Sequence, residues 1–349
     1  MRIVVAQTAF LGDVVLTTPV FAAVRRHWPE AHITAWVRPE AAGVLAGHPA
    51  VDAALLDDKR GRDRGLAGVV RVARRVRAGR FDVALAVHKS LRTAVVLALA
   101  RVPRRIGFRQ SAGAWLYHER ATRDPAQHDL DRNLAIVAPL GIDPSRESAQ
   151  PELSVTPESQ ARLDTLLRHA GVPVGAPLVG LAPGSVWATK RWTPEGYAAV
   201  AVELSRRGYT VVLLGAPNEA AIAADVNRRA GGIAISLAGQ TDVATLVAAI
   251  DRCRAMVCND SAPMHIAAAR GVPQVAVFGP THPSMGFAPR GDNAIVVQRD
   301  LSCRPCSTHG GVRCPIGTHA CMRDLASAEV LAALDRLLAR APQRRTSPA

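Results

Sequence analysis

One stretch in the last third of the chain, residues 255–280, most constrains the fold. Residues 255–258 are an apolar run typical of a buried parallel strand, and a polar triplet, 259–261, follows them. A helix is predicted next, over 263–270, because proline suits a first helical turn, where the N–H it lacks would have no partner. A second apolar strand, 274–278, then completes a strand–turn–helix–strand unit. This order predicts a parallel α/β sheet with a ligand site at the carboxyl ends of its strands.

The same alternation recurs along the chain in two series. In the first series, strands are predicted at residues 2–7, 32–37, 53–56 and 82–87, with an amphipathic helix over 13–27. In the second series, strands are predicted at 178–182, 210–215 and 233–237, with helices at 193–207, 218–229 and 242–251. A polar, proline-containing segment, 141–157, separates the two series and is predicted to be a linker. The chain is therefore predicted to fold as two Rossmann-like domains, each a parallel sheet whose strands alternate with helices.

Composition narrows the class of function. Hydrophobic residues at 48% and charged residues at 21% are typical of a globular protein, and no apolar run approaches the ~20 residues needed to span a bilayer. Asp13 interrupts the apolar amino terminus, which argues against a signal peptide. A net charge of +14 indicates nucleic acid, anionic lipid or a phosphorylated substrate as partner, or only an arginine-rich surface. An aromatic content of 4% argues against base stacking, and neither half contains G-x-G-x-x-G.

A resemblance to a known family is carried by residues 259–284, NDSAPMHIAAARGVPQVAVFGPTHPS. They resemble the signature of the ADP-heptose:lipopolysaccharide heptosyltransferases, glycosyltransferase family 9, and the likeness extends over residues 1–335. It implies a GT-B fold, two Rossmann-like domains facing across a cleft, with an acceptor-binding domain at 1–150 and a nucleotide-sugar-binding domain at 151–335. Residues 336–349 would be a helix end and tail, disordered from 342. The sequence departs from the family at Ala262, where glycine is usual and where a methyl group would crowd a diphosphate slightly.

Asp13 is the candidate catalytic base. It follows Gly12 in T-A-F-L-G-D, after the first predicted strand, where glycine lets the backbone approach a ligand. From the residues alone, an ordinary helix N-cap is the favoured interpretation of Asp13, since aspartate fills that role well. The resemblance favours catalysis, since the family's base lies in this G-D motif and would deprotonate an acceptor hydroxyl.

Lys190 is the second candidate catalytic residue. It lies in the loop APGSVWATKRW, residues 182–192, which resembles the P-G-x-x-W-x-x-K-R-W element of the family. The resemblance implies that Lys190 stands against the nucleotide diphosphate and offsets the charge that grows as the sugar leaves. Ser185 and Thr189 would donate hydroxyls to the same phosphates, while Trp192 packs the loop onto the sheet.

Other donor contacts follow from the resemblance. Glu219 would bind the ribose hydroxyls, although a helix-dipole role for a first-turn glutamate is an equal alternative. Asp260 would bind hydroxyls of the transferred heptose, and Gly239 would border the adenine. The remaining substrate-binding candidates are Ser261, Ala262 and Met264, through backbone N–H groups on phosphate, His265 near the diphosphate, where a packed helix histidine is the alternative, and Thr281 on the opposite side.

Two further patterns suggest metal sites. The D-x-D triplet Asp129-Leu130-Asp131 precedes a predicted helix away from any strand end, so capping and first-turn charge are favoured over metal binding. Cys303, Cys306, Cys314 and Cys321 are spaced C-x2-C-x7-C-x6-C, which would suit structural zinc or an iron–sulfur cluster. Free or partly oxidised thiols are favoured over a metal site. The family resembled needs no metal for catalysis, and no cofactor is expected to be required.

The resulting hypothesis is an inverting glycosyltransferase that moves a heptose from ADP-L-glycero-D-manno-heptose to the lipopolysaccharide inner core. W-A-T-K-R-W is closer to heptosyltransferase II than to I. The enzyme would be cytoplasmic and peripheral on the anionic cytoplasmic face of the inner membrane, and would bind no nucleic acid. The alternatives are another GT-B nucleotide-sugar enzyme, such as an epimerase or hydrolase, a transferase with a different sugar or acceptor, and a non-catalytic nucleotide-sugar or nucleic-acid binding protein.

Overall fold

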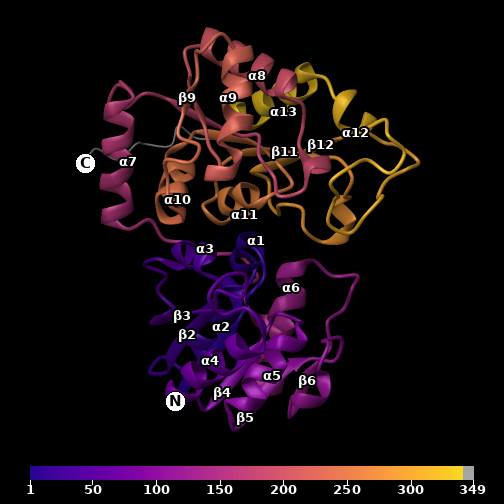
Figure 1. Cartoon of the computed structure of the whole chain (residues 1–349). Coiled ribbons are helices and arrows are strands. Elements are labelled where there is room, and N and C mark those ends of the chain that lie inside the picture. Colours follow the sequence, from indigo (N-terminus) through magenta and orange to yellow (C-terminus); the bar gives the residue numbers. More distant parts are fainter. Residues whose placement is uncertain (341–349) are drawn as a thin grey trace. The chain divides into compact units, whose positions relative to one another are not determined.

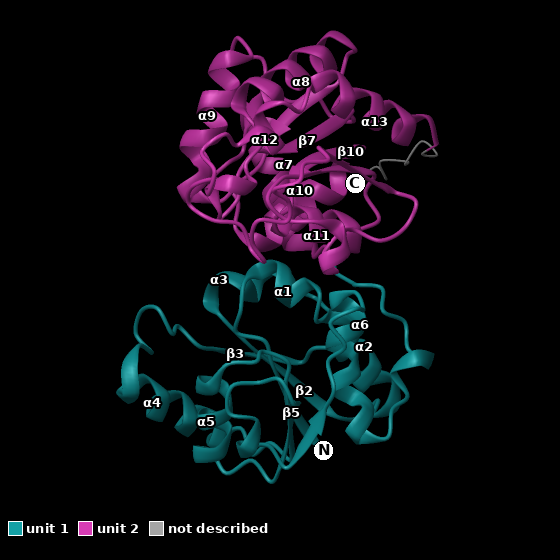
Figure 2. Ribbon diagram, turned by 90° about the vertical axis from the view of Figure 1, so that its right-hand side faces the viewer, with its two compact units in different colours: residues 1–154 teal, residues 155–349 magenta. Residues whose placement is uncertain are grey.

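A computed structural model describes residues 1–340, and the chain divides into two compact units, Met1–Ser154 and Val155–Ala349 (Figure 2). The boundary falls within the predicted linker. Each unit is built on one six-stranded sheet whose neighbouring strands all pair in parallel (Figure 1). The predicted fold class, α/β with two Rossmann-like parallel sheets, is therefore confirmed. The tail expected at 342–349 lies outside the described residues.

Unit 1 places its first strand in the middle of its sheet. Its strands are β1 (Arg2–Ala6), β2 (His32–Val37), β3 (Ala53–Leu56), β4 (Val83–Ala86), β5 (Arg104–Phe108) and β6 (Glu119–Ala121), in the spatial order β3-β2-β1-β4-β5-β6. Its α-helices are α1 (Leu11–Val15), α2 (Thr18–His27), α3 (Pro39–Ala42), α4 (Gly65–Ala78), α5 (Leu91–Leu99) and α6 (Asp129–Leu134). Helix α4 packs on α5, and α2 contacts α6. The order reverses between β1 and β4, so the topological switch point lies at their carboxyl ends.

The helix expected over 13–27 is broken into α1 and α2, which corrects the prediction of one continuous helix. Pro19 is the physical reason, because it has no N–H to donate to the Val15 carbonyl. The Thr18 hydroxyl donates to that carbonyl instead, at 2.8 Å. The break separates the short α1, which carries Asp13, from the longer α2.

Unit 2 repeats this topology. Its strands are β7 (Leu178–Ala182), β8 (Thr210–Leu213), β9 (Ile235–Ser236), β10 (Ala255–Asn259), β11 (Gln274–Phe278) and β12 (Ala294–Gln298), in the order β12-β11-β10-β7-β8-β9. Its α-helices are α7 (Pro157–His169), α8 (Pro194–Arg206), α9 (Ala220–Arg229), α10 (Val243–Arg252), α11 (Ala262–Ala269), α12 (Ala320–Arg323) and α13 (Ser327–Arg340). Numbered within its own unit, each sheet has the Rossmann order 3-2-1-4-5-6.

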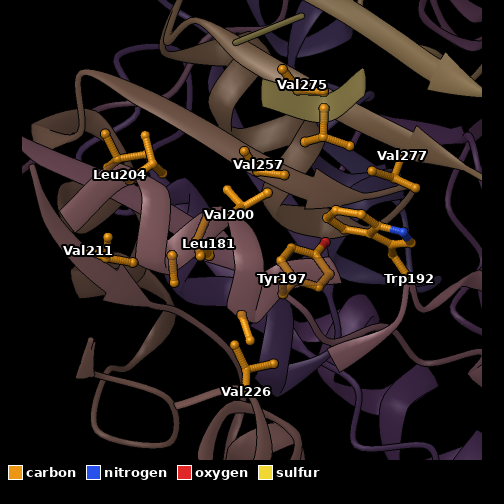
Figure 3. Packing of buried hydrophobic residues seen from close by; sticks show 14 of the residues in the cluster. Leu181, Trp192, Tyr197, Val200, Leu204, Val211, Val226, Val257, Val275 and Val277 are labelled. Carbon is orange, nitrogen blue, oxygen red and sulfur yellow. The ribbon is translucent and has the colours of Figure 1, made fainter. Parts of the chain in front are cut away.

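The core of unit 2 joins its central strands to α8, α9 and α13. Figure 3 shows Trp192 and Tyr197 side by side in this cluster, with Val257 and Val277 of β10 and β11 nearby. The two rings meet edge to face at 5.0 Å between centroids, and the Trp192 Nε1 donates to the Leu325 carbonyl at 3.2 Å. Trp192 therefore anchors the end of the loop after β7 in the core, in the packing role predicted for it.

None of the helices within residues 1–340 is both long enough and apolar enough to cross a membrane.

Candidate active site

Asp13 lies in the first turn of α1, directly beyond the carboxyl end of β1. The N-cap position is occupied by Phe10, and the Asp13 Oδ2 accepts a hydrogen bond from the Phe10 N–H at 3.0 Å. The surrounding protein desolvates the carboxylate and, with help from the negative charge of Asp129, raises the pKa of Asp13 to about 6. A carboxylate with this pKa is largely ionised at neutral pH and is still basic enough to accept a proton.

Asp129 belongs to the D-x-D triplet. It begins α6, is buried, and forms ion pairs with Arg123 and with Arg132, the latter at 3.6 Å. Asn133 Nδ2 donates to the other carboxylate oxygen at 3.1 Å. The triplet is thus first-turn charge on a helix, as predicted. The sequence did not reveal that Asp129 also acts on Asp13, far away in the chain.

Lys190 and Asp260 form a buried ion pair in unit 2. Lys190 ends a 3-10 turn, Ala188–Lys190, in the loop after β7, and Asp260 follows β10, the neighbouring strand. The Lys190 Nζ lies 2.6 Å from the Asp260 Oδ2, and the two side chains are only 12% and 7% exposed. The Thr281 hydroxyl, beyond β11, donates to the same carboxylate oxygen at 2.7 Å. Three strand ends therefore contribute to one cluster at the switch point of the sheet.

Asn259 holds the loop after β7 in place, a role that the sequence analysis missed. Its side chain is fully buried at the end of β10, and its Oδ1 accepts a hydrogen bond from the Trp192 N–H at 3.0 Å. Its Nδ2 donates to the carbonyls of Pro183 and Gly184 at 2.9 and 3.2 Å. The polar residue directly after an apolar strand was the available signal, but it was interpreted only as the start of a turn.

Ser185 and Thr189 are both buried in the same loop. The Thr189 hydroxyl donates to the Gly311 carbonyl at 3.0 Å and accepts from the Gly311 N–H at 2.7 Å. Arg191 Nε donates to the Ser185 carbonyl at 2.9 Å. To donate to a phosphate, the Thr189 hydroxyl would therefore have to give up the hydrogen bond that it donates to the Gly311 carbonyl.

Glu219 lies at the carboxyl end of the next strand, β8. Its Oε2 accepts a hydrogen bond from the Ala216 N–H at 2.9 Å, which fits the alternative role in a first helical turn. Its carboxylate also faces the loop after β7, because a Cβ built on Gly184 would lie 2.2 Å from the Glu219 Cδ. Gly239, with a φ of +78°, lies close to Pro217 at the same end of the sheet. The structure thus places Glu219 beside the loop after β7 and Gly239 beside Pro217, and their roles toward ribose and adenine stay predictions.

Helix α11 begins beside Asp260. Ser261 is its N-cap residue, but its hydroxyl donates to the Asn259 carbonyl at 3.4 Å rather than capping the helix. The Met264 N–H already donates to the Ser261 carbonyl at 3.1 Å, so its expected bond to phosphate would compete with this one. Ala262 opens the helix and His265 is buried one turn further on.

The four carboxyl-terminal cysteines carry free thiols, with Cys306 exposed and Cys321 buried. Burial raises the pKa of the Cys321 thiol to about 11. Across residues 1–340, no three His, Cys, Asp or Glu side chains are grouped so that they would hold a metal ion. The arrangement gives no support to the zinc or iron–sulfur site, which stays a prediction.

Comparison with known proteins identifies the family. Residues 69–313 match the model of glycosyltransferase family 9 (heptosyltransferase). The chain is 29% identical to lipopolysaccharide heptosyltransferase 3 of Escherichia coli, over 78% of this chain and 82% of that one. It is 28% identical to lipopolysaccharide heptosyltransferase 2 of Salmonella typhimurium, with coverages of 81% and 84%. A family 9 glycosyl transferase from Veillonella parvula superimposes with a TM-score of 0.87 at 27% identity, covering 97% of this chain and 98% of that one.

The family match covers most of the chain, and both sheets carry charged residues at the strand ends where a ligand binds in such folds. Like the relatives that it matches, the chain is an α/β protein with two Rossmann-like units, and its sequence resemblance is confirmed. The chain belongs to glycosyltransferase family 9, the heptosyltransferases.

Proposed function

We propose that this chain transfers a heptose from ADP-L-glycero-D-manno-heptose to the lipopolysaccharide inner core, with inversion and with Asp13 as general base. The observation that carries the proposal is a carboxylate at the end of β1 whose pKa is raised to about 6 in a family 9 protein. The two relatives compared above are named lipopolysaccharide heptosyltransferases, which favours this donor and acceptor.

Asp13 would take the proton from the attacking hydroxyl of the acceptor. A single displacement, in which that oxygen bonds to the anomeric carbon as the bond to the diphosphate breaks, inverts the configuration. The hydrogen bond from the Phe10 N–H occupies one carboxylate oxygen, Oδ2, and fixes the orientation of the group. The other oxygen then receives the proton. A positioned general base of this kind raises the reaction rate by about 10²- to 10⁴-fold.

Lys190 would stabilise the ADP leaving group. In the structure its charge is offset by Asp260, so a diphosphate would replace this partner at the same place. Asp260 would then be available to accept hydrogen bonds from hydroxyls of the heptose. Negative charge grows on the diphosphate as the sugar leaves, so Lys190 binds the transition state more strongly than the ground state. This charge compensation is the reason for proposing a reaction that requires no metal.

An anionic acceptor is favoured by a group of cations at strand ends of unit 1: Arg38 after β2, Lys59 and Arg60 after β3, and Lys89 after β4. Burial, and then the charges of Lys59, Lys89 and Arg38, lower the pKa of His88 to about 4. Burial and nearby cations also lower the pKa of Lys59. These groups gain stability from a bound phosphate or carboxylate, which a phosphorylated lipopolysaccharide core would supply.

A peripheral position on the cytoplasmic face of the inner membrane is part of the proposal. Helix α4 exposes two apolar side chains, Leu66 at 86% and Val70 at 44%, next to exposed arginines: Arg64, Arg71, Arg74 and Arg77. Mixed apolar and cationic faces favour anionic lipid surfaces. In a vesicle flotation assay, the protein should bind vesicles that contain anionic phospholipid and not neutral ones. The double variant Arg74→Glu, Arg77→Glu should bind the anionic vesicles more weakly. Equal binding to both vesicle types would contradict the membrane role.

The function is tested by following ADP release from ADP-heptose with and without a heptosylated Kdo2–lipid A acceptor. We expect release that depends on acceptor, a product of inverted anomeric configuration by NMR, and a rate unchanged by EDTA. Release without acceptor would indicate a hydrolase or epimerase. No release with any acceptor would contradict the donor, and loss of activity in EDTA would contradict the metal-independent mechanism.

A further inference from the structure

Residues 301–321 follow β12, extend into the start of α12 and carry all four carboxyl-terminal cysteines; we call them the cysteine segment. They contact residues on both sides of the Lys190–Asp260 pair. On one side they hold Thr189, the residue before Lys190. The Thr189 N–H and hydroxyl both donate to the Gly311 carbonyl at 3.0 Å, and the Gly311 N–H returns a bond to the hydroxyl at 2.7 Å. His319 Nε2 lies 2.8 Å from the Thr189 carbonyl oxygen, so that nitrogen carries the donated proton.

Gly310 gives the cysteine segment direct contact with Lys190. Its φ is +89°, and an added Cβ would lie 2.9 Å from the Trp187 Cβ and 3.0 Å from the Lys190 Cγ. A side chain at this position would be strained and would push against the stem of the lysine. The backbone of the cysteine segment therefore packs directly on the turn that carries Lys190.

Arg304 holds the other side. Its guanidinium donates to the Thr281 carbonyl at 2.8 Å, and to the Gly279 and Arg299 carbonyls. It also reaches the Gln298 Oε1 at 3.0 Å, at the end of β12. Because the Thr281 hydroxyl donates to the carboxylate of Asp260, this arginine fixes the residue that orients Asp260.

We propose that the cysteine segment is a clamp that positions both members of the Lys190–Asp260 pair for the nucleotide diphosphate of the donor. His319 and Gly310 position Lys190 through the turn before it, and Arg304 positions Asp260 through Thr281. These are positioning residues, since none is placed on the substrate. The identity of the ligand that the pair binds rests on the proposed function. The evidence for the clamp itself is the set of contacts within unit 2.

The location of these contacts favours positioning over general folding support. The polar contacts of Gly311 and His319 with the loop after β7 converge on Thr189, the residue adjacent to Lys190. The hydrogen bonds of Arg304 end at carbonyls around the end of β11 and at β12. A weakened clamp should therefore loosen the site locally while the core around Trp192 stays intact.

His319→Ala is the decisive variant, with His319→Gln as the conservative one and His309→Ala as the matched control. Residue 319 has a φ of 51°, so alanine and glutamine carry the same backbone strain, and only glutamine retains a side-chain donor. His309 is an exposed histidine of the same segment. Each protein is examined by hydrogen–deuterium exchange of the peptide spanning 186–192, by calorimetric ADP binding, and by donor and acceptor KM.

We expect His319→Ala to exchange faster in this peptide, to bind ADP about fivefold to tenfold more weakly, and to raise the donor KM by the same factor with the acceptor KM unchanged. His319→Gln should recover part of this loss, and His309→Ala should match the wild type. Gly310→Ala should reproduce the defect of His319→Ala.

Unchanged exchange in both His319→Ala and Gly310→Ala would overturn the clamp. Faster exchange with unchanged ADP affinity would overturn its role at the donor site. If the wild-type protein bound no ADP while His319→Ala still exchanged faster than the wild type in the peptide 186–192, the clamp would be supported as a structural element. The same result would count against the proposed function. The two failures are therefore distinguishable.

Discussion

The two units share one topology but differ in the charged residue that follows the first strand of each sheet. In unit 1, the end of β1 presents a carboxylate, Asp13, whose pKa is raised to about 6 by desolvation and by Asp129. In unit 2, the corresponding end of β7 leads to a cation, Lys190, which is paired with Asp260. The same strand order thus supports a group suited to accept a proton and a group suited to bind phosphate.

This difference shows that chemistry in these units lies in the loops and not in the sheets. Parallel strands bring loops from distant parts of the chain to one edge, whatever side chains the loops carry. In unit 1, burial and then the like charge of Asp129 raise the pKa of the Asp13 carboxyl. In unit 2, the Asp260 carboxylate has Lys190 as its ion-pair partner.

The largest effect should come from Asp13→Asn. Asparagine keeps the size of the side chain but cannot accept the proton, so kcat should fall about 10³-fold, within the range for general bases. ADP binding, assigned to unit 2, should stay unchanged by calorimetry, and the exposed carboxylate variant Asp143→Asn should behave as wild type. An Asp13→Asn enzyme with more than a tenth of the wild-type kcat would remove the assigned difference between the units.

Lys190→Met should give the next largest effect. It removes the cation that offsets charge on the leaving group, so kcat should fall about 10²-fold, as for the loss of one electrostatic contact in a transition state. It also leaves Asp260 buried without its lysine, so the free energy of unfolding should fall by about 3 kcal/mol. Lys190→Arg keeps the charge and should retain more activity than Lys190→Met. Equal kcat values for the two would show that the charge of Lys190 has no catalytic role.

Asn259→Ala tests how the loop of unit 2 is held. It deletes three buried hydrogen bonds, with Trp192, Pro183 and Gly184, and should lower the free energy of unfolding by about 3 kcal/mol in urea titrations. Asn293→Ala, at an exposed asparagine, should change it by less than about 0.5 kcal/mol. If the two variants were equally stable, Asn259 would not be the anchor of the loop.

The pH dependence of kcat/KM should give the smallest effect, and it tests directly whether the pKa of Asp13 in unit 1 is raised. Below a pH of about 6 Asp13 binds a proton and ceases to be a base, so the rate falls on the acid side. At pH 5 it should reach about a tenth of its maximum, from the fraction of ionised carboxylate. Asp129→Asn removes a like charge and should move this limb to lower pH, provided that circular dichroism shows a folded protein. An acid limb that stays in place would contradict the coupling between the two carboxylates.

Local patterns predicted most elements of this fold. The strands at 32–37, 53–56 and 274–278 have the predicted bounds, because apolar runs and the turns between them are local properties. The strands β5, β6 and β12 were not predicted. Both β5 and β6 contain charged residues, which interrupt the apolar pattern of a buried strand. The break between α1 and α2 depends on Pro19, whose effect on a continuous apolar pattern was overlooked.

The candidate site was predicted in its residues but not in its contacts. The sequence placed Asp13, Lys190 and Asp260 at strand ends, and it assigned Trp192 to packing. It assigned Thr189 a free hydroxyl, whereas this group is bonded to Gly311. It also gave Lys190 and Asp260 separate ligands, without the ion pair that joins them.

The sequence by itself determined the two α/β units, the order of their elements and the loops at the strand ends. These depend on hydrophobic periodicity and turn residues, which act over a few neighbours. Only the tertiary structure decided which charges meet: Asp129 beside Asp13, Lys190 on Asp260, and the cysteine segment on both sides of that pair. The physical reason is that pKa shifts and ion pairing depend on distance in space, and strand order, not sequence separation, sets that distance.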